Sequence, residues 1–224
     1  QLRLERVVLV GVWTEGTVTD AENSLTELAA LAETAGSEVL AALIQRRAKP
    51  DPATFIGSGK VEELREVVQS TGADTVICDG ELAPSQLRNL EDRVKVKVVD
   101  RVALILDIFA QHAKSAEGKA QVELAQLQYQ TQRLRGWGQS LSRQAGGRAA
   151  GGEGIGGRGP GETKLETDRR RIQARIAKLR RELAGLKGTR ETKRADRKRH
   201  KIASVAIAGY TNAGKSSLLN RLTG

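Results

Sequence analysis

Short apolar runs alternate with helix-patterned segments from residue 7 to about residue 113. This alternation is typical of a parallel β-sheet whose strands are joined by crossover helices. The expected strands are residues 7–13, 38–45, 75–79 and 94–99. We therefore expect an α/β fold with a small parallel sheet in this part of the chain.

Capping residues and apolar spacing predict helices between these strands. Thr19 and Glu22 have the spacing of a capping box, which would open the first helix, and Gly36 would end it. A third helix is expected near Pro84, and residues 101–113 carry a dense apolar pattern that predicts a fourth.

The second helix of this region follows residues 57–60, whose sequence Gly-Ser-Gly-Lys resembles part of a phosphate-binding loop. Thr54 and Val61 stand where that motif needs a glycine and a hydroxyl residue. We interpret the stretch as a helix start. An anion held at the helix N-terminus is the alternative.

Two later segments, residues 119–144 and 162–190, carry apolar stripes typical of a coiled coil. The first stripe repeats every seven residues at Leu127, Leu134 and Leu141, with Leu124 beside them. The second consists of Leu165, Ile172, Ile176, Leu179, Leu183 and Leu186. Thr163 and Glu166 have the spacing of a capping box where the later helix should begin. Each stripe needs a partner, so the two helices are expected to form an antiparallel hairpin.

Positive charge is concentrated in this helical region. The whole chain has a net charge of +10, and residues 133–200 hold 20 Lys and Arg against 7 Asp and Glu, a local charge of +13. The rest of the chain carries −3. A local field of this kind usually serves an anionic partner, and nucleic acid is the leading candidate.

The predicted helices are joined by residues 146–161, sixteen residues of which nine are glycine. A flexible linker is one interpretation, but a turn between antiparallel helices needs only a few residues. We therefore expect a tip that contacts RNA, flanked by basic residues that contact phosphates without sequence preference. The predicted RNA-binding residues are Arg148, Gly156, Gly157, Arg158, Gly159, Arg169, Arg170, Arg171 and Arg175.

Residues 209–217, with the sequence Gly-Tyr-Thr-Asn-Ala-Gly-Lys-Ser-Ser, match a complete phosphate-binding loop. The loop lies between residues 202–208, predicted to form a buried strand, and residues 217–222, predicted to form a helix. Lys215 would reach the outer phosphates of a nucleotide, and Ser216 would ligate Mg²⁺. The predicted nucleotide-binding residues are Gly209, Tyr210, Thr211, Asn212, Ala213, Gly214, Lys215, Ser216 and Ser217. The motif does not choose between GTP and ATP, and a glycine-rich turn of similar sequence is the alternative.

The sequence ends at Gly224, about one helix after this loop. A parallel sheet must bury both faces, so one strand and one helix cannot make a complete nucleotide-hydrolysing domain. We therefore expect that residues 202–224 are poorly supported and that these 224 residues alone do not hydrolyse nucleotide.

Other features bear on the class of protein. The single Cys78 excludes an internal disulfide framework and fits a reducing compartment; we interpret it as a small packed residue. No apolar run has the length of a membrane span, and no secretion signal is recognisable at the N-terminus. These features indicate a cytoplasmic protein without a membrane partner.

Three stretches together carry a family resemblance: residues 117–127, 156–168 and 209–217. They resemble HflX-type GTPases, and the likeness runs from about residue 7 to residue 224. It implies three parts: an N-terminal α/β subdomain (1–113), a basic helical hairpin (114–200) whose tip is residues 146–161, and the start of a GTPase domain (201–224).

The resemblance implies a GTP hydrolase that binds the large (50S) ribosomal subunit and its 23S rRNA and splits stalled or idle 70S ribosomes, often under stress. The hairpin tip would then point toward the peptidyl transferase centre, and we expect a monomer. GTP or GDP would bind with Mg²⁺, and Asn212 would help to hold K⁺. Residues 148–154 look like an extension of the shorter tip that is usual in the family. Catalytic and guanine-reading residues would lie beyond Gly224, so none is assigned.

Two other functions fit the sequence. One is an rRNA-binding assembly or hibernation factor whose nucleotide only licenses attachment, and the other is an ATP-dependent RNA remodeller.

Overall fold

The computed structural model describes residues 5–145, 160–200, 205–209 and 214–223. The chain divides into two compact units, Gln1–Leu183 and Ala184–Gly224. Each unit is described by itself.

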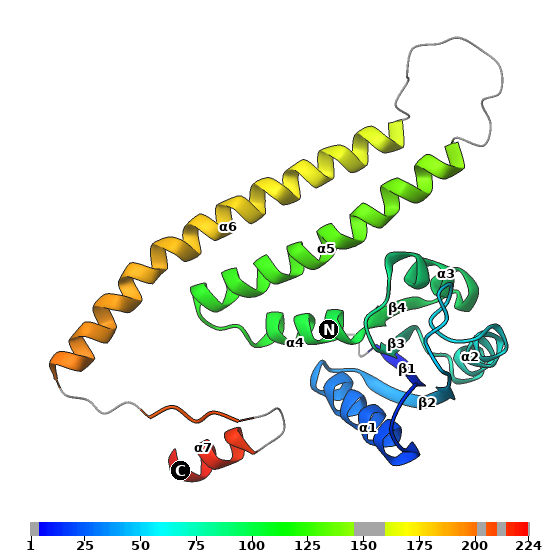
Figure 1. Ribbon diagram of the computed structural model, residues 1–224, viewed down its shortest axis with the longest axis horizontal. Coiled ribbons are helices and arrows are strands. Elements are labelled where there is room, and N and C mark those ends of the chain that lie inside the picture. The colour runs from blue at the N-terminus through cyan, green and yellow to red at the C-terminus, as the bar shows by residue number, and fades with distance from the viewer. Residues whose placement is uncertain (1–4, 146–159, 201–204, 210–213, 224) are drawn as a thin grey trace. The chain divides into compact units, whose positions relative to one another are not determined.

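The first unit is built on a parallel sheet of four strands, in the order β2-β1-β3-β4 (Figure 1). The strands are β1 (Arg6–Trp13), β2 (Glu38–Arg46), β3 (Thr75–Asp79) and β4 (Lys97–Asp100). The predicted α/β class and parallel sheet are confirmed. The last strand begins later than predicted because Val94 is buried as the final residue of the preceding helix, and Lys95 then turns the chain with a positive φ of 62°.

Four helices flank the sheet: α1 (Val18–Thr34), α2 (Ser58–Thr71), α3 (Pro84–Val94) and α4 (Arg101–His112). The capping box predicted for the first helix is wrong by two residues. Thr17 is the observed cap: its backbone N–H donates to Asp20 Oδ2 at 2.7 Å, and Asp20 N–H donates back to Thr17 Oγ1 at 3.2 Å. Gly16, with a φ of +85°, provides the turn that lets the helix begin earlier.

The stretch at residues 57–60 is a helix start, as interpreted from the sequence. Gly57 caps α2 with its N–H donated to Gln45 Oε1 at 2.8 Å. The side chain of Lys60 forms an ion pair with Glu63 one turn later, at 2.7 Å.

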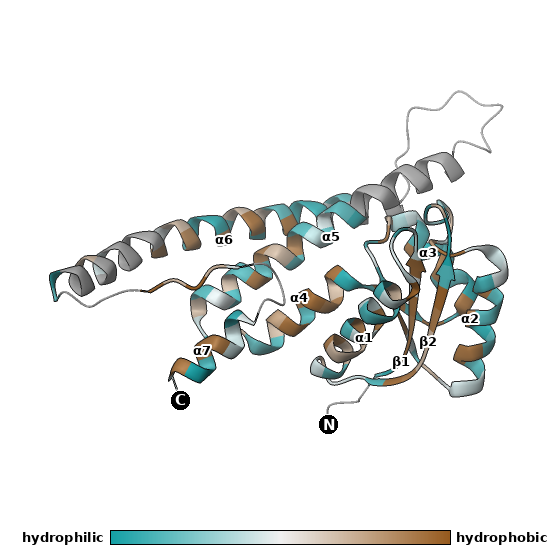
Figure 2. Cartoon of the chain, turned by 60° about the horizontal axis from the view of Figure 1, so that its bottom comes forward, coloured by the Kyte–Doolittle hydropathy of each residue, from teal (hydrophilic) through white to brown (hydrophobic). Residues whose placement is uncertain are grey.

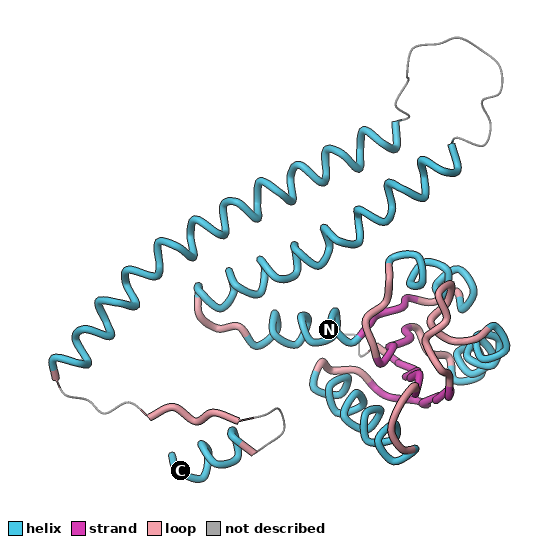
Figure 3. Tube along the Cα trace, viewed as in Figure 1, coloured by secondary structure: helices cyan, strands magenta, loops and turns pink. Residues whose placement is uncertain are grey.

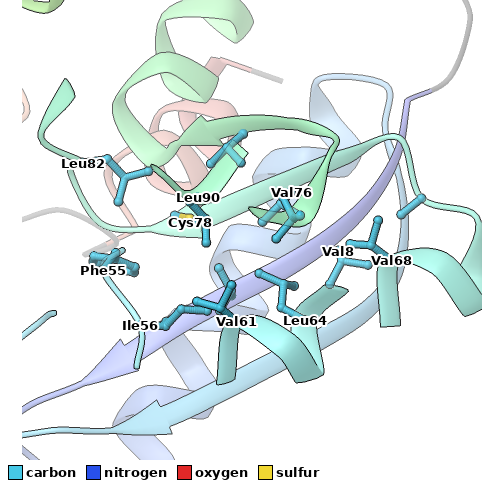
Figure 4. Packing of buried hydrophobic residues seen from close by; sticks show 14 residues of the cluster. Val8, Phe55, Ile56, Val61, Leu64, Val68, Val76, Cys78, Leu82 and Leu90 are labelled. Carbon is cyan, nitrogen blue, oxygen red and sulfur yellow. The ribbon is translucent and has the colours of Figure 1, made fainter. Parts of the chain in front are cut away.

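The strands alternate their side chains between two hydrophobic clusters, one on each face of the sheet. On one face Val8, Val76 and Cys78 pack against α2 and α3 (Figure 4). On the other face Leu9 and Ile77 pack against α1 and α4. Hydrophobic residues run along β1 and β2 between these layers (Figure 2). Both faces of the parallel sheet are therefore covered, as this kind of sheet requires.

Two long helices follow, α5 (Ala116–Ala145) and α6 (Pro160–Arg199). Within the first unit they run side by side in opposite directions (Figures 1 and 3). Arg175 joins them by donating to both carboxylate oxygens of Glu123, at 2.6 and 2.7 Å, and Leu179 is buried. The coiled-coil seam along the full length of the hairpin stays a prediction.

The predicted start of the later helix at Thr163 is wrong, because α6 already begins at Pro160. Proline is favoured at the first helical position, where its missing N–H costs no hydrogen bond.

The second unit contains the end of α6, residues 205–209 and α7 (Lys215–Thr223). The predicted strand at residues 202–208 is not observed where the chain is described: residues 205–208 form no strand, and Val205 is 90% exposed. No residue of α7 is buried. A strand is defined by its neighbours, and no neighbouring strand lies among the described residues of this unit.

Within the described ranges, no helix is both long and apolar enough to cross a lipid bilayer.

Candidate functional site

The predicted phosphate loop lies in the second unit. Gly209 ends an extended segment, Gly214 has a left-handed φ of +77°, and Lys215, Ser216 and Ser217 form the first turn of α7. Residues 210–213 lie outside the described part of the chain. The Lys215 ammonium donates to the Gly209 carbonyl at 2.9 Å, so the two ends of the loop lie together.

This geometry suits a phosphate group. The first turn of a helix has backbone N–H groups without partners inside the helix, and the helix dipole favours negative charge there. Gly214 leads the chain into that turn in a conformation that favours glycine, and its carbonyl accepts from Leu218 N–H at 2.8 Å. The Lys215 ammonium lies beside this end of the helix, where it can exchange the Gly209 carbonyl for a phosphate oxygen.

Ser216 fits the predicted role of Mg²⁺ ligand only if the phosphates of a bound nucleotide supply other ligands. Its side chain is exposed at the start of α7. No group of three or more metal-ligating side chains occurs among the residues that the structure describes. Mg²⁺ commonly binds through one or two protein oxygens together with phosphates and water. The residues present fit such a nucleotide-bound ion.

The predicted RNA-binding residues fall into three groups. Arg148, Gly156, Gly157, Arg158 and Gly159 lie outside the described residues. On α6 the side chains of Arg170 and Arg171 are each 78% exposed, with acidic neighbours on the same helix, and Arg169 is also exposed. These three arginines are available to an anionic partner.

Arg175 differs from this group because both of its hydrogen bonds go to Glu123 on α5. The same hydrogen bonds lower the pKa of the Glu123 carboxyl, so this group stays ionised in the pair. The structure thus places Arg175 in the contact between the two hairpin helices.

Sequence reasoning missed a buried carboxylate that joins the sheet to the hairpin. Asp100, the last residue of β4, is fully buried. It accepts from Ala103 N–H at 2.9 Å, which caps α4, and from Leu82 N–H at 3.1 Å in the loop before α3. Two residues of α5 complete the set: the Arg133 guanidinium donates at 2.8 Å, and the Tyr129 hydroxyl also donates.

The two α5 residues are arranged around this carboxylate as one group. The Arg133 guanidinium lies 4.3 Å from the centre of the Tyr129 ring. Burial, followed by the bond to Asp100, raises the pKa of the Tyr129 hydroxyl, which therefore remains a donor. In the sequence, an acidic residue such as Asp100 between an apolar strand and an apolar helix indicates a helix N-cap. The partners on α5 gave no such signal, because they are 29 and 33 residues away.

A small cavity of about 230 Å³ lies at the carboxyl ends of β1 and β3, where the strand order changes direction. Such crevices often hold ligands in parallel sheets. Glu15, Asp20 and Asp79 line this one. Asp79 accepts from Ser24 Oγ at 2.5 Å and from Arg101 at 2.8 Å. The acidic lining is unfavourable for a phosphate group.

Three family models match successive parts of the chain. Residues 22–110 match the GTP-binding GTPase N-terminal model, and residues 112–197 match the GTP-binding GTPase middle region. Residues 204–224 match a model described as 50S ribosome-binding GTPase.

Several relatives named GTPase HflX are similar over nearly the whole chain. The protein from Lacrimispora saccharolytica is 51% identical over 98% of this chain and 50% of its own length. The protein from Alkalihalophilus pseudofirmus is 48% identical over 100% of this chain and 51% of its own length, and that from Escherichia coli K12 is 46% identical over 89% and 45%.

Solved structures of GTP-binding proteins have a similar fold. A GTP-binding protein from Sulfolobus solfataricus, in complex with GDP, matches with a TM-score of 0.53 and 26% identity over 98% of this chain and 53% of its own. A second structure, of SsGBP with GDP, matches with a TM-score of 0.60 over 98% of this chain and 56% of its own; at 24% identity it shows the fold alone.

The chain thus spans about half the length of the relatives it matches. On these similarities it belongs to the family of HflX GTPases.

Proposed function

We propose that this chain is part of a GTPase that docks on the large ribosomal subunit through its basic hairpin and separates the subunits of stalled or idle 70S ribosomes. The observation that carries the nucleotide half of the proposal is the contact between Lys215 and Gly209 at the N-terminus of α7. It brings the two ends of the predicted phosphate loop to one place, in a chain whose relatives are named GTPases.

In the nucleotide site, the N–H groups of residues 214–217 would hold the phosphates, and Lys215 would neutralise the outer ones as a point charge. Ser216 would give its hydroxyl oxygen to Mg²⁺, which when bound supplies charge neutralisation between the outer phosphates. Asn212 is proposed to help to hold K⁺. The group that activates water is not assigned in residues 1–224, and we do not expect these residues alone to turn over GTP.

The hairpin supplies the RNA half of the proposal. Its surplus of positive charge is a local one, and Arg169, Arg170 and Arg171 are exposed on one segment of α6. Contacts of this kind bind phosphates with little dependence on sequence. The match of residues 204–224 to a model described as 50S ribosome-binding GTPase supports the large subunit as the partner. The tip, residues 146–161, would point toward the peptidyl transferase centre.

Subunit separation follows if the docked protein fits the free large subunit better than the intact ribosome. A protein shifts such an equilibrium only by the difference between its affinities for the two states. Bound GTP would favour the docked form, and hydrolysis would release it. The three parts, residues 1–113, 114–200 and 201–224, would then serve as support, RNA-binding arm and nucleotide switch.

The test of this function is Lys215→Ala in the full-length protein. Losing a charged partner of the outer phosphates should weaken GTP binding at least about tenfold, measured with a fluorescent GTP analogue. It should also abolish the GTP-dependent release of small subunits, measured by sedimentation of 70S ribosomes. Lys49→Ala, which removes an exposed lysine of the α/β subdomain, is the control and should change neither result.

Unchanged GTP affinity in Lys215→Ala would rule out residues 209–217 as the nucleotide site. Subunit release that continues with a non-hydrolysable analogue through many rounds would favour the licensed binding factor, and a preference for ATP would favour the RNA remodeller.

A further inference from the structure

Helix α5 packs against α4 and α3, and side-chain hydrogen bonds fix it to the α/β subdomain at two levels. The first is its start, where α4 and α5 are joined by residues 113–115. Ser115 caps α5 there: its carbonyl accepts from Lys119 N–H at 2.9 Å and its hydroxyl from Gly118 N–H at 3.0 Å. The second is the bond set of Asp100 with Tyr129 and Arg133, which we call the Asp100 clamp.

These two places lie far enough apart to fix a direction. Tyr129 is about 20 Å along the helix from the first residue of α5, at 1.5 Å per residue. A rod held at one point can pivot, whereas a rod held at two separated points cannot. The rest of α5 continues beyond the clamp to Ala145, so a small displacement at the clamp becomes a larger one at the end of the helix.

Apolar packing is incomplete at the level of the Asp100 clamp. A groove of about 550 Å³ lies beside Arg133, between α3, α5 and α6, and it is lined by Pro84, Leu87, Gln130 and Ile172 among others. Helices α3 and α5 contact each other, but the groove leaves the packing beside Arg133 incomplete. The directional bonds to Asp100 therefore determine where this part of α5 lies.

The carboxylate is also the partner on which the Arg133 side chain depends. Arg133 Nε is buried and has no hydrogen-bond partner within the described part of the chain, and the ion pair with Asp100 holds the other end of the guanidinium. A buried charge that loses its partner is costly, so Arg133 would leave this place if Asp100 were neutral.

We propose that Asp100 is a positioning residue that sets the direction of the hairpin relative to the sheet, and that RNA binding by the hairpin depends on it although it does not touch RNA. The part about RNA rests on the proposed function; the part about direction does not. If the direction of the hairpin is fixed before binding, the binding free energy is not reduced by the entropy cost of ordering the hairpin.

The experiment measures direction in the 224-residue chain and binding to large subunits in the full-length protein with a GTP analogue. Spin labels are placed through Gln69→Cys on α2 and Gln132→Cys on α5, both exposed positions. Cys78 can stay because it is buried. Three variants weaken the clamp: Asp100→Asn, which keeps a residue able to cap α4, Tyr129→Phe and Arg133→Met. Arg101→Met is the matched control, since it removes the neighbouring ion pairs with Asp79 and Glu27 but no ion pair with the described residues of α5.

We expect the distance distribution between the labels to broaden about twofold in Asp100→Asn and Arg133→Met, less in Tyr129→Phe, and not at all in Arg101→Met. Affinity for isolated large ribosomal subunits should fall about fivefold in the same order.

Unchanged distances in Asp100→Asn and Arg133→Met would overturn the inference, whatever the binding results. Broadened distances with full affinity would also overturn it, because direction would then not matter for binding. A full-length parent protein that fails to bind subunits in the presence of a GTP analogue contradicts the proposed function instead, and the distances alone then decide on the clamp.

Discussion

Single residues show what residue type predicts and what depends on the folded structure. Cys78 was interpreted as a small packed residue, and it is buried between β1, α2 and α3. The charge of Arg175 predicts contact with RNA, which stays a prediction, and in the fold the side chain binds Glu123 on the other hairpin helix. The type of a residue predicts its burial well because hydrophobicity is a property of the side chain itself. The role of a charged residue also depends on the partner that folding brings next to it.

The Cys78 thiol gives a prediction at this scale. Burial, with the nearby Asp100 and Asp79 carboxylates, raises its pKa, so the reactive thiolate is scarce and covered. Reaction with a disulfide reagent should be about a thousandfold slower than that of an exposed thiol and should follow local opening of the fold. Ellman's reagent measures this, with Gln69→Cys as the exposed reference. Equal rates for the two thiols would show that the core around β3 opens readily.

At the scale of elements, the sequence predicts which segments form helices and strands, and local chemistry then shifts their ends. The four strands of the first unit lie within a few residues of their predicted places. The first helix starts earlier because Thr17 and Asp20 make a better cap behind Gly16, and α6 starts earlier because Pro160 favours a first helical position. Several residues near each end are chemically able to cap, and the backbone turn before the helix selects among them.

The contact between α5 and α6 gives a pH-dependent prediction. The folded-state pKa of Glu123 is lowered, chiefly by the Arg175 hydrogen bonds. The pair therefore stabilises the hairpin above the ordinary glutamate range near pH 4.3, and this contribution is lost as the pH falls through the lower folded-state pKa. The difference in Tm between parent and Glu123→Gln should thus be largest near neutral pH and vanish in acid.

Thermal unfolding followed by circular dichroism from about pH 7 to about pH 3 measures this difference. Glu66→Gln, at an exposed position of α2, is the control and should track the parent. A difference that grows in acid would contradict the assignment of the pair. Because both partners are partly exposed, the effect should also shrink at high salt.

At the scale of the whole molecule, positive charge is concentrated in one part of the chain. Residues 133–200 carry +13 and the rest −3, so association with RNA should depend strongly on salt through the hairpin alone. The triple substitution of Arg169, Arg170 and Arg171 by Gln should reduce the slope of log affinity against log salt by about 2 to 3, as expected for three lost phosphate contacts.

Binding to large ribosomal subunits over a salt series measures this slope in the full-length protein. The control neutralises three exposed basic residues of the α/β subdomain, Lys49, Arg65 and Arg93, so that both triple variants have the same total charge. If both triple variants lose the same slope, net charge rather than the exposed face of α6 governs binding.

What the sequence by itself determined is the part set by short-range rules: the α/β order of the first unit, the two long basic helices, and the phosphate-loop composition at residues 209–217. These features depend on hydrophobic period, capping and glycine content, which neighbours along the chain supply. Only the tertiary structure decided that Asp100 binds Tyr129 and Arg133, that Arg175 pairs with Glu123, and that residues 205–208 form no strand where they are described. Each of these outcomes depends on a partner brought close by folding, and the free energy of a buried charge or an exposed strand edge is set by that partner rather than by the residue itself.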